Sequence, residues 1–184
     1  MTARDAQRAP AETAWEGRYI KIVKQGTWEY VSRVGGITAA VMLAVDEGAV
    51  ILVEQYRVPI GTTCIELPAG LVGDEQEGEE IETAAIRELE EETGYRAERM
   101  VNLGKFYASP GMSSEGFSLM RAEGLSKVSE GGGVEGEDIE VHRVPIAEVA
   151  AFVDRKRAEG AAVDVKLLLL LAGGFLQPRG GAGD

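Results

Sequence analysis

The sequence contains a single cysteine, Cys64, and a single histidine, His142. One cysteine excludes an internal disulfide, and the two residues together are too few for a zinc site built from cysteine and histidine ligands. A cysteine nucleophile would have His142 as its only available partner. We therefore interpret Cys64 as a packed, inert thiol.

Long apolar runs are also missing. The leucine-rich run 167–172, like every other apolar run in the chain, falls far short of the roughly 20 residues that a membrane-spanning helix needs. Residues 1–17 carry charges along their length and lack the apolar core of a signal peptide. We expect a cytoplasmic protein whose residues 1–16 are mobile.

Positive charge is scarce. The chain has 19 Lys and Arg against 31 Asp and Glu, and its net charge of -12 argues against nucleic acid or an anionic membrane as a partner. Segment 66–92 holds eleven acids and one base, Arg87, so it alone sums to -10 and leaves the rest of the chain nearly neutral. Acidity this local is what a cation-binding site requires.

The acidic segment reads as a helix over 79–93, ended by Gly94. In a helix, Glu88, Glu91 and Glu92 fall within about 100° of one another, because neighbours on a helix surface are three and four residues apart. Carboxylates at this spacing repel and raise one another's pKa, so such a cluster is normally offset by cations. Mg²⁺ or Mn²⁺ fits oxygen ligands best.

The remaining pattern predicts one domain with a terminal extension. Strands 37–45 and 49–57 are read as a pair joined at 46–48, and 131–133 as a flexible glycine loop. The leucine run near the C-terminus is expected to be buried in a helix. The other predicted strands are two within 18–34, joined around Gln25-Gly26, then 64–67, 101–107, 117–122 and 139–144. Residues 68–78 are read as a loop, and the C-terminal helices are 146–159 and 164–176.

From Glu79 to Tyr95 the sequence resembles the Nudix box, G-x5-E-x7-R-E-U-x-E-E-x-G-U, where U is a bulky apolar residue. Two glycines are candidates for the first box position. Gly73 has the literal spacing, whereas Gly70 follows a Pro-Ala pair, as the family's glycine usually does. We prefer Gly70 and interpret 73–77 as carrying a short insertion ahead of the helix.

This resemblance implies an α+β fold, an α/β/α sandwich with a mixed central sheet. It divides the chain into a β-rich N-terminal region with a hairpin, 1–35, and a Nudix domain, 36–184. It also implies hydrolysis of a nucleoside diphosphate linked to another group, assisted by two or three Mg²⁺ ions, with Mn²⁺ as a possible substitute. The implied metal ligands are Glu88, Glu91, Glu92 and the backbone carbonyl of Ala69. Arg87, with Glu79, would orient the cluster.

Segments outside the box are similar to the ADP-ribose pyrophosphatase subgroup of this family: 17–21, 27–33, 55–59, 64–70 and the loop 109–115 with Pro110. By this resemblance Arg57 holds a phosphate, for which its fork of donors is suited. Tyr19 and Trp28 would enclose the adenine and Arg33 would hydrogen-bond its edge. The subgroup's aromatics reach a partner's site, which implies a homodimer. Glu115 would be the general base, with Glu91 and Arg87 acting beside it in catalysis.

Several alternatives stay open. The leading hypothesis is hydrolysis of ADP-ribose to AMP and ribose 5-phosphate, and the second is hydrolysis of another nucleotide sugar, such as GDP-mannose or ADP-glucose. A third is a Nudix-like binding or regulatory module without catalysis, although such modules generally lose box carboxylates and this chain keeps them. Trp28 can also be an ordinary half-buried strand residue, and Glu91 or Glu66 can replace Glu115 as the base.

Overall fold

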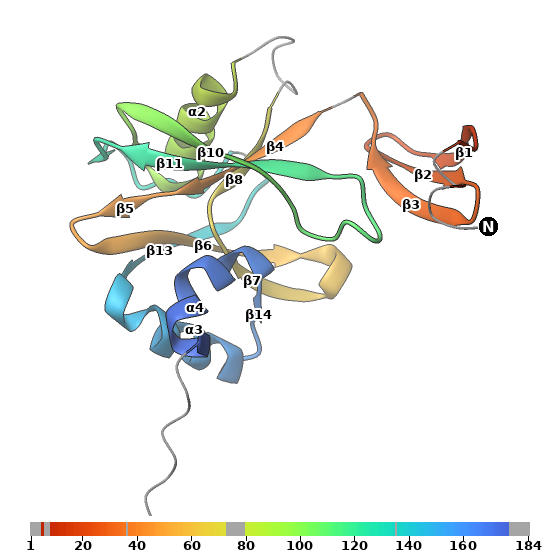
Figure 1. The fold of residues 1–184 in the computed structure, drawn as a ribbon. Helices are drawn as coiled ribbons and strands as arrows, with labels where there is room; N and C mark the ends of the chain where they lie inside the picture. Colours follow the sequence, from red (N-terminus) through yellow and green to blue (C-terminus); the bar gives the residue numbers. More distant parts are fainter. Residues whose placement is uncertain (1–4, 6–7, 36, 73–79, 135, 177–184) are drawn as a thin grey trace, which may run out of the picture.

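The computed structural model describes residues 5, 8–35, 37–72, 80–134 and 136–176. Two β-sheets form the middle of the molecule, with helix α2 (Ile81–Thr93) on one side and helices α3 (Val149–Ala158) and α4 (Leu168–Leu176) on the other, as Figure 1 shows. One apolar cluster packs beneath α2 and a second beneath α3 and α4. The expected α/β/α sandwich of the α+β class is confirmed.

The first sheet is mixed and has the strand order β10-β11-β4-β8. Strand β11 runs parallel to β4, whereas β10 and β8 pair antiparallel with their neighbours. Its strands are β4 (Thr38–Leu43), β8 (Ala69–Val72), β10 (Arg99–Tyr107) and β11 (Gly116–Glu123). The short β8 lies in a segment that the sequence predicts as a loop, and it brings Ala69 and Gly70 alongside α2.

The second sheet has the order β13-β6-β7-β14, with a short β5 also paired to β6. Its strands are β5 (Val45–Asp46), β6 (Ala49–Arg57), β7 (Thr62–Glu66), β13 (Ile139–Pro145) and β14 (Ala162–Val163), and a 3-10 turn, η1 (Val58–Ile60), joins β6 to β7. A further small pair consists of β9 (Tyr95–Arg96) and β12 (Ser126–Lys127).

The two strands predicted as a pair, 37–45 and 49–57, both form, but the pairing is wrong. Strand β4 belongs to the first sheet and β6 to the second. Of the predicted strand 37–45, only its last residue, in β5, pairs with β6. The chain changes sheets at Ala44, which is fully buried. Runs that are apolar on both faces fit two covered sheets as well as they fit one hairpin, so the pattern does not distinguish these arrangements.

The predicted helices are confirmed, with short 3-10 turns η2 (Ile146–Glu148) and η3 (Val165–Leu167) leading into α3 and α4. The leucine run is only partly buried, contrary to the prediction. Leu167 and Leu171 are in the core, whereas Leu168 and Leu169 are 46% and 51% exposed, because a helix on a surface turns only one face inward. No helix within the described ranges is long and apolar enough to cross a membrane.

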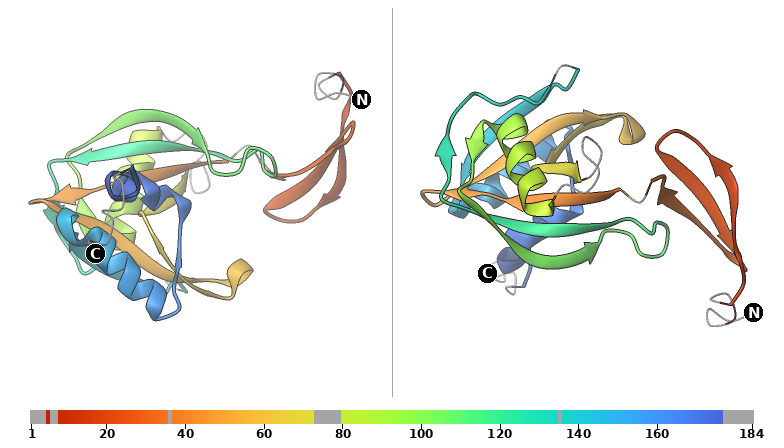
Figure 2. Two further views of the ribbon diagram at one scale, coloured as in Figure 1. Left: turned by 60° about the horizontal axis from the view of Figure 1, so that its bottom comes forward. Right: turned by 90° about the horizontal axis from the view of Figure 1, so that it is seen from above.

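The N-terminal strands form a separate antiparallel sheet, β1 (Ala11–Glu16), β2 (Ile20–Gln25) and β3 (Trp28–Arg33). The expected hairpin around Gln25-Gly26 is present. The prediction that residues 1–16 are mobile is wrong for β1, which pairs with β2 along its length. This sheet stands away from the body (Figure 2). Its β1 side chains are exposed throughout, and Val23 of β2 is buried.

Candidate active site

A cavity of about 530 Å³ opens between α2, the first sheet and the end of β3. Its wall brings together residues that the sequence placed in one site from widely separated segments: Arg33, Arg57, Ala69, Arg87, Glu88, Glu91, Glu92 and Glu115. Tyr19 and Trp28, the remaining two predicted site residues, are not among those that line it.

Strand β8 presses directly against the acidic face of α2. The backbone N–H of Ala69 donates to Oε2 of Glu92 at 3.0 Å. At Gly70 an added Cβ would lie 2.2 Å from Cδ of Glu88, so any larger residue would displace the Glu88 side chain. This close approach supports Gly70 as the box glycine. Gly73 and Glu79 lie outside the described residues.

The helix carboxylates sit in an environment that favours a bound cation. Glu92 is 7% exposed, and burial raises its pKa to about 8, with the charges of Glu88 and Glu137 adding to the effect. The hydrogen bond from Ala69 and the charge of Arg57 oppose this rise. A desolvated carboxylate beside other carboxylates becomes favourable when a cation neutralises it. This oxygen-rich, acidic donor set fits Mg²⁺.

Arg87 lies between two of these carboxylates. Its Nη1 is 3.0 Å from Oε1 of Glu88 and 3.1 Å from Oε2 of Glu91. This geometry suits the predicted role of holding the cluster in place. The end of α2 is fixed in a second way, because the N–H groups of Gly132 and Gly133 donate to the carbonyls of Glu92 and Glu91. The glycine loop thus caps the helix that carries the site.

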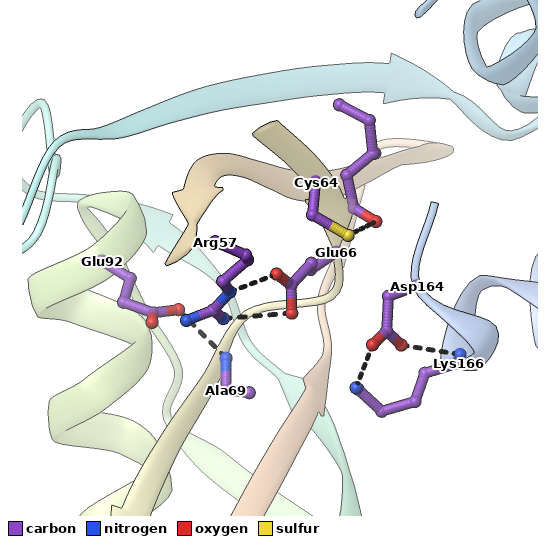
Figure 3. A network of polar contacts seen from close by, with 8 residues as sticks. Arg57, Cys64, Glu66, Ala69, Glu92, Asp164 and Lys166 are labelled. Carbon is purple, nitrogen blue, oxygen red and sulfur yellow. Dashed lines mark hydrogen bonds and ion pairs between the residues drawn. The ribbon is translucent and has the colours of Figure 1, made fainter. Parts of the chain in front are cut away.

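Arg57, at the end of β6, is held by a carboxylate from the neighbouring strand. Its Nε and Nη2 donate to the two oxygens of Glu66 at 2.5 and 3.0 Å. Glu66 is buried, whereas 41% of the Arg57 side chain is exposed. Figure 3 shows the guanidinium between Glu66 and Glu92. Glu66 therefore aims Arg57 at the cavity while leaving part of its fork open.

Glu115 and Arg33, which the sequence assigns to different tasks, form an ion pair. Nε of Arg33 is 2.5 Å from Oε1 of Glu115. Glu115 follows a loop that begins after β10, and Arg33 is the last residue of β3. The N-terminal sheet thus contributes directly to the cavity of its own chain.

The two aromatic residues lie at opposite ends of the β2–β3 ladder. Trp28 pairs with Gln25 at the hairpin, and Tyr19 precedes the pair Ile20–Arg33 at the other end. Trp28 is five residues from Arg33, which corresponds to about 16 Å along a strand. Tyr19 and Trp28 are 64% and 43% exposed. One chain therefore cannot place both rings on one base.

Sequence reasoning missed two charged residues of the cavity, Glu137 and Lys166. Glu137 follows the glycine loop and accepts a hydrogen bond from the N–H of Val134. Its charge helps to raise the pKa of Glu92. Lys166 lies in η3, with Nζ 2.7 Å from Asp164 and 5.7 Å above the Phe117 ring. Neither residue belongs to a recognisable spacing. The one available signal was the run of three glycines, which permits a close backbone approach.

A second group of possible metal ligands lies near α3. Atoms of Glu54, Glu140 and His142 fall within 4.8 Å of one another. Nζ of Lys156 is 2.6 Å from Glu54, however, and Nε2 of His142 is 3.0 Å from the same carboxylate. The lysine supplies the positive charge that an ion would bring, so we interpret this group as a polar link between the second sheet and α3.

Comparison with known proteins agrees with this arrangement. Residues 36–168 match the NUDIX domain. The chain is 38% identical over 134 residues to an ADP-ribose pyrophosphatase of Bacillus subtilis, covering 72% of this chain and 70% of that protein. It is 36% identical over 155 residues to a GDP-mannose pyrophosphatase of Cronobacter sakazakii, covering 79% and 75%. The mouse ADP-sugar pyrophosphatase is 38% identical over 117 residues, covering 54% and 52%.

Among solved structures, one described as an ADP compounds hydrolase has the same fold. It superposes with a TM-score of 0.64 at 22% identity, over 90% of this chain and 91% of that one. The acidic helix, its glycine contact with β8 and the extent of the sequence match lead to one assignment: the chain belongs to the NUDIX domain family.

Proposed function

We propose that this Nudix hydrolase cleaves the pyrophosphate bond of ADP-ribose and releases AMP and ribose 5-phosphate, in a Mg²⁺-dependent reaction. The observation that carries the proposal is the cavity itself, in which the complete acidic face of α2 meets the arginines of β3 and β6. The relatives named ADP-ribose pyrophosphatase and ADP-sugar pyrophosphatase support this choice of substrate.

The chemistry of the cavity suits a pyrophosphate. Negative charge shields its phosphorus atoms from water, and divalent ions relieve this shielding and acidify water. Glu88, Glu91, Glu92 and the carbonyl of Ala69 would hold the ions, two or three in number. Arg87 keeps Glu88 and Glu91 in place. Mn²⁺ would fit the same oxygen donors.

Positively charged groups that line the same cavity would bind the substrate. Arg57 presents the open part of its guanidinium fork, which suits a phosphate. Lys166, directed by Asp164 over the Phe117 ring, would contact the pyrophosphate or the terminal ribose. Ala39 and Val41 give the cavity an apolar floor, which suits the faces of a ribose.

Three carboxylates outside the helix line the cavity: Glu66, Glu115 and Glu137. Glu66 is buried with both of its oxygens bonded to Arg57, which leaves Glu115 and Glu137 to accept the proton of the attacking water. Glu115, the residue favoured by the resemblance, is paired with Arg33. Glu137 reaches the same cavity, and its charge acts on Glu92. A base must lie near the attacked phosphorus, and ligated carboxylates have their oxygens occupied. We retain Glu115 as the proposed base and take Glu137 as its competitor.

The position of the aromatic residues supports a homodimer. A base lying near the Arg33 end of β3 can meet Tyr19 of the same chain, whereas Trp28 is about 16 Å away along the strand. The Trp28 that completes an adenine sandwich would then come from a second chain. The unpaired thiol of Cys64 and the net charge of -12 fit a cytoplasmic enzyme with no nucleic acid or membrane partner.

A second substrate has its own support. The relative from Cronobacter sakazakii that covers 79% of this chain is named GDP-mannose pyrophosphatase. The two bases differ in their hydrogen-bonding edges, and ADP-glucose differs from ADP-ribose only in its sugar. A non-catalytic module is a third possibility, opposed by the retained carboxylates.

A nucleotide-sugar panel separates these functions. ADP-ribose, ADP-glucose and GDP-mannose are each incubated with the protein and Mg²⁺, with and without excess EDTA, and the products are identified. We expect the highest kcat/KM with ADP-ribose, products AMP and ribose 5-phosphate, and no turnover in EDTA. A clear preference for GDP-mannose would make it the proposed substrate in place of ADP-ribose. Absence of turnover on every compound would favour the non-catalytic module.

A further inference from the structure

The loop between β10 and β11 extends the N-terminal sheet. The N–H of Val31 donates to the carbonyl of Met112, and the N–H of Ser114 donates to the carbonyl of Val31, both at 2.9 Å. These bonds form a parallel bridge between Val31 and Ser113. Residues 112–114 therefore act as a short fourth strand along the free edge of β3.

The same loop enters the first sheet immediately afterwards. Gly116 pairs with Tyr107 at the start of β11, and Phe117 pairs in parallel with Ala39 of β4. Ser114 is thus bonded to one sheet and Gly116 to the other, with Glu115 as the single residue between them. Its backbone is fixed further, because its N–H donates to Oγ of Ser113 at 2.9 Å.

Arg33 occupies the equivalent place on the neighbouring segment. It ends β3, and the chain then continues to β4, which starts at Thr38. The two segments run side by side in the same direction across the seam between the sheets. The ion pair between Arg33 and Glu115 joins them at this seam (Figure 2 shows the two sheets and their separation).

The pair has little to do with stability. The side chains of Arg33 and Glu115 are 29% and 41% exposed, and exposed ion pairs contribute weakly to folding. Its effect is local: two backbone hydrogen bonds hold residues 112–114 against β3, and the ion pair restrains the Glu115 carboxylate together with the backbone that carries it across the seam.

We propose that Arg33 is a positioning residue for Glu115, so that the seating of the N-terminal sheet against the body sets the activity of the catalytic loop. The proposal rests on the proposed function, in which Glu115 acts at the substrate. It differs from an adenine contact for Arg33 in a measurable way. Loss of a base contact weakens binding and raises KM, whereas loss of positioning lowers kcat.

The test compares Arg33→Gln and Arg33→Lys with Lys24→Gln. Lys24 is a matched control, because it forms an exposed ion pair with Glu29 in the same sheet, away from the cavity. With ADP-ribose, Arg33→Gln should lower kcat by about ten- to a hundredfold, as expected for a displaced catalytic group, and leave KM within about threefold. Arg33→Lys should recover part of kcat, and Lys24→Gln should match the wild type.

Hydrogen exchange of residues 112–116 gives a second readout that needs no substrate. Arg33→Gln and Glu115→Gln should each speed exchange at the Ser114 and Glu115 amides, and the double variant should add nothing further. A raised KM with unchanged kcat and wild-type exchange would overturn the proposal and indicate that Arg33 contacts the nucleotide instead. If the wild type hydrolyses no nucleotide sugar, the proposed function fails, and exchange alone decides whether Arg33 positions the loop.

Discussion

Glu92 is the residue on which the electrostatics of the cavity depend. Its side chain is buried beside Glu88 and below Arg57, and its pKa is raised to about 8 from an ordinary value of 4.5. Between these two values the unfolded chain has released the proton that the folded chain still holds. Stability of the metal-free protein therefore falls as pH rises through this window.

Replacing Glu92 with Gln removes the titrating group and tests this sign. Below the ordinary pKa the residue is neutral in both states, so it contributes no pH dependence there. Across the window, in EDTA, the free energy of unfolding of the wild type should fall more steeply than that of Glu92→Gln. Denaturant titrations at several pH values measure the difference. Parallel profiles for the two proteins would show that burial does not raise the pKa of Glu92.

The same substitution should also lower activity. Glu92→Gln keeps the size of a proposed metal ligand and removes its charge, so kcat/KM with Mg²⁺ should fall by roughly a hundredfold or more. The fold should be retained, since an amide can still accept the Ala69 N–H. Turnover equal to wild type would place the metal site elsewhere, and full activity in EDTA would contradict the Mg²⁺ dependence itself.

The general base is also decided at single residues. Glu115→Gln should lower kcat by about 10²–10⁴-fold with little change in KM, the size of a lost acid–base group. Glu137→Gln is the comparison, because this carboxylate lines the same cavity. If Glu137→Gln gives the large loss and Glu115→Gln stays within about threefold, the base is Glu137 and Glu115 serves only to hold the loop.

At the scale of elements, the site depends on how closely β8 packs on α2. Gly70→Ala would bring a methyl group to 2.2 Å from the Glu88 side chain. Glu88 can swing away into the open cavity, so we expect a modest loss of stability, about 1 kcal/mol. Mg²⁺ affinity and kcat/KM should fall much further. Calorimetric Mg²⁺ titration and thermal unfolding measure the two effects, and wild-type Mg²⁺ affinity would show that Glu88 is not a ligand.

The elements show why some parts of this site could be predicted from the sequence. Glu88, Glu91 and Glu92 belong to one helix, whose spacing fixes their relative positions. Glu137 lies just before β13 and Lys166 lies in η3 just after β14, so both reach the cavity through the connections of the second sheet. Such contacts depend on the topology of the sheets. The sequence pattern predicts a hairpin between 37–45 and 49–57, whereas the chain passes from the first sheet to the second at Ala44.

Short and exposed elements were the hardest to predict. Strand β1 has exposed side chains throughout, so it lacks the apolar alternation that identifies a strand. Strand β8 falls in a segment that is interpreted from the sequence as a loop, because Pro68 and Gly70 favour turns. Both strands form because a neighbour offers a free edge: β2 for β1, and β4 for β8.

At the scale of the whole molecule, the N-terminal sheet is short of buried surface. Three strands with mostly exposed side chains rarely hold together alone. The bridge between Val31 and Ser113 anchors one edge, and Trp15, Tyr19 and Trp28 remain 56%, 64% and 43% exposed. A second copy of the chain would cover such aromatic surface, as the proposed dimer requires.

Mixing two impaired variants tests whether Trp28 acts in its own chain or in a partner's. Trp28→Ala should raise KM roughly tenfold or more, because stacking binds ground and transition states alike. Glu92→Gln should lower activity in every site of its own homodimer. If Trp28 serves the partner's cavity, a mixed dimer contains one site with both an intact Glu92 and an intact Trp28.

Activity should therefore return when the two variants are unfolded together and refolded. With random pairing, half of the dimers are mixed and each has one complete site, so about a quarter of the wild-type activity is expected at low ADP-ribose. Each variant refolded alone is the control, and a mass measurement at working concentration confirms the dimer. If Trp28 acts within its own chain, every site carries one defect, and the mixture gives only the average of the two variants.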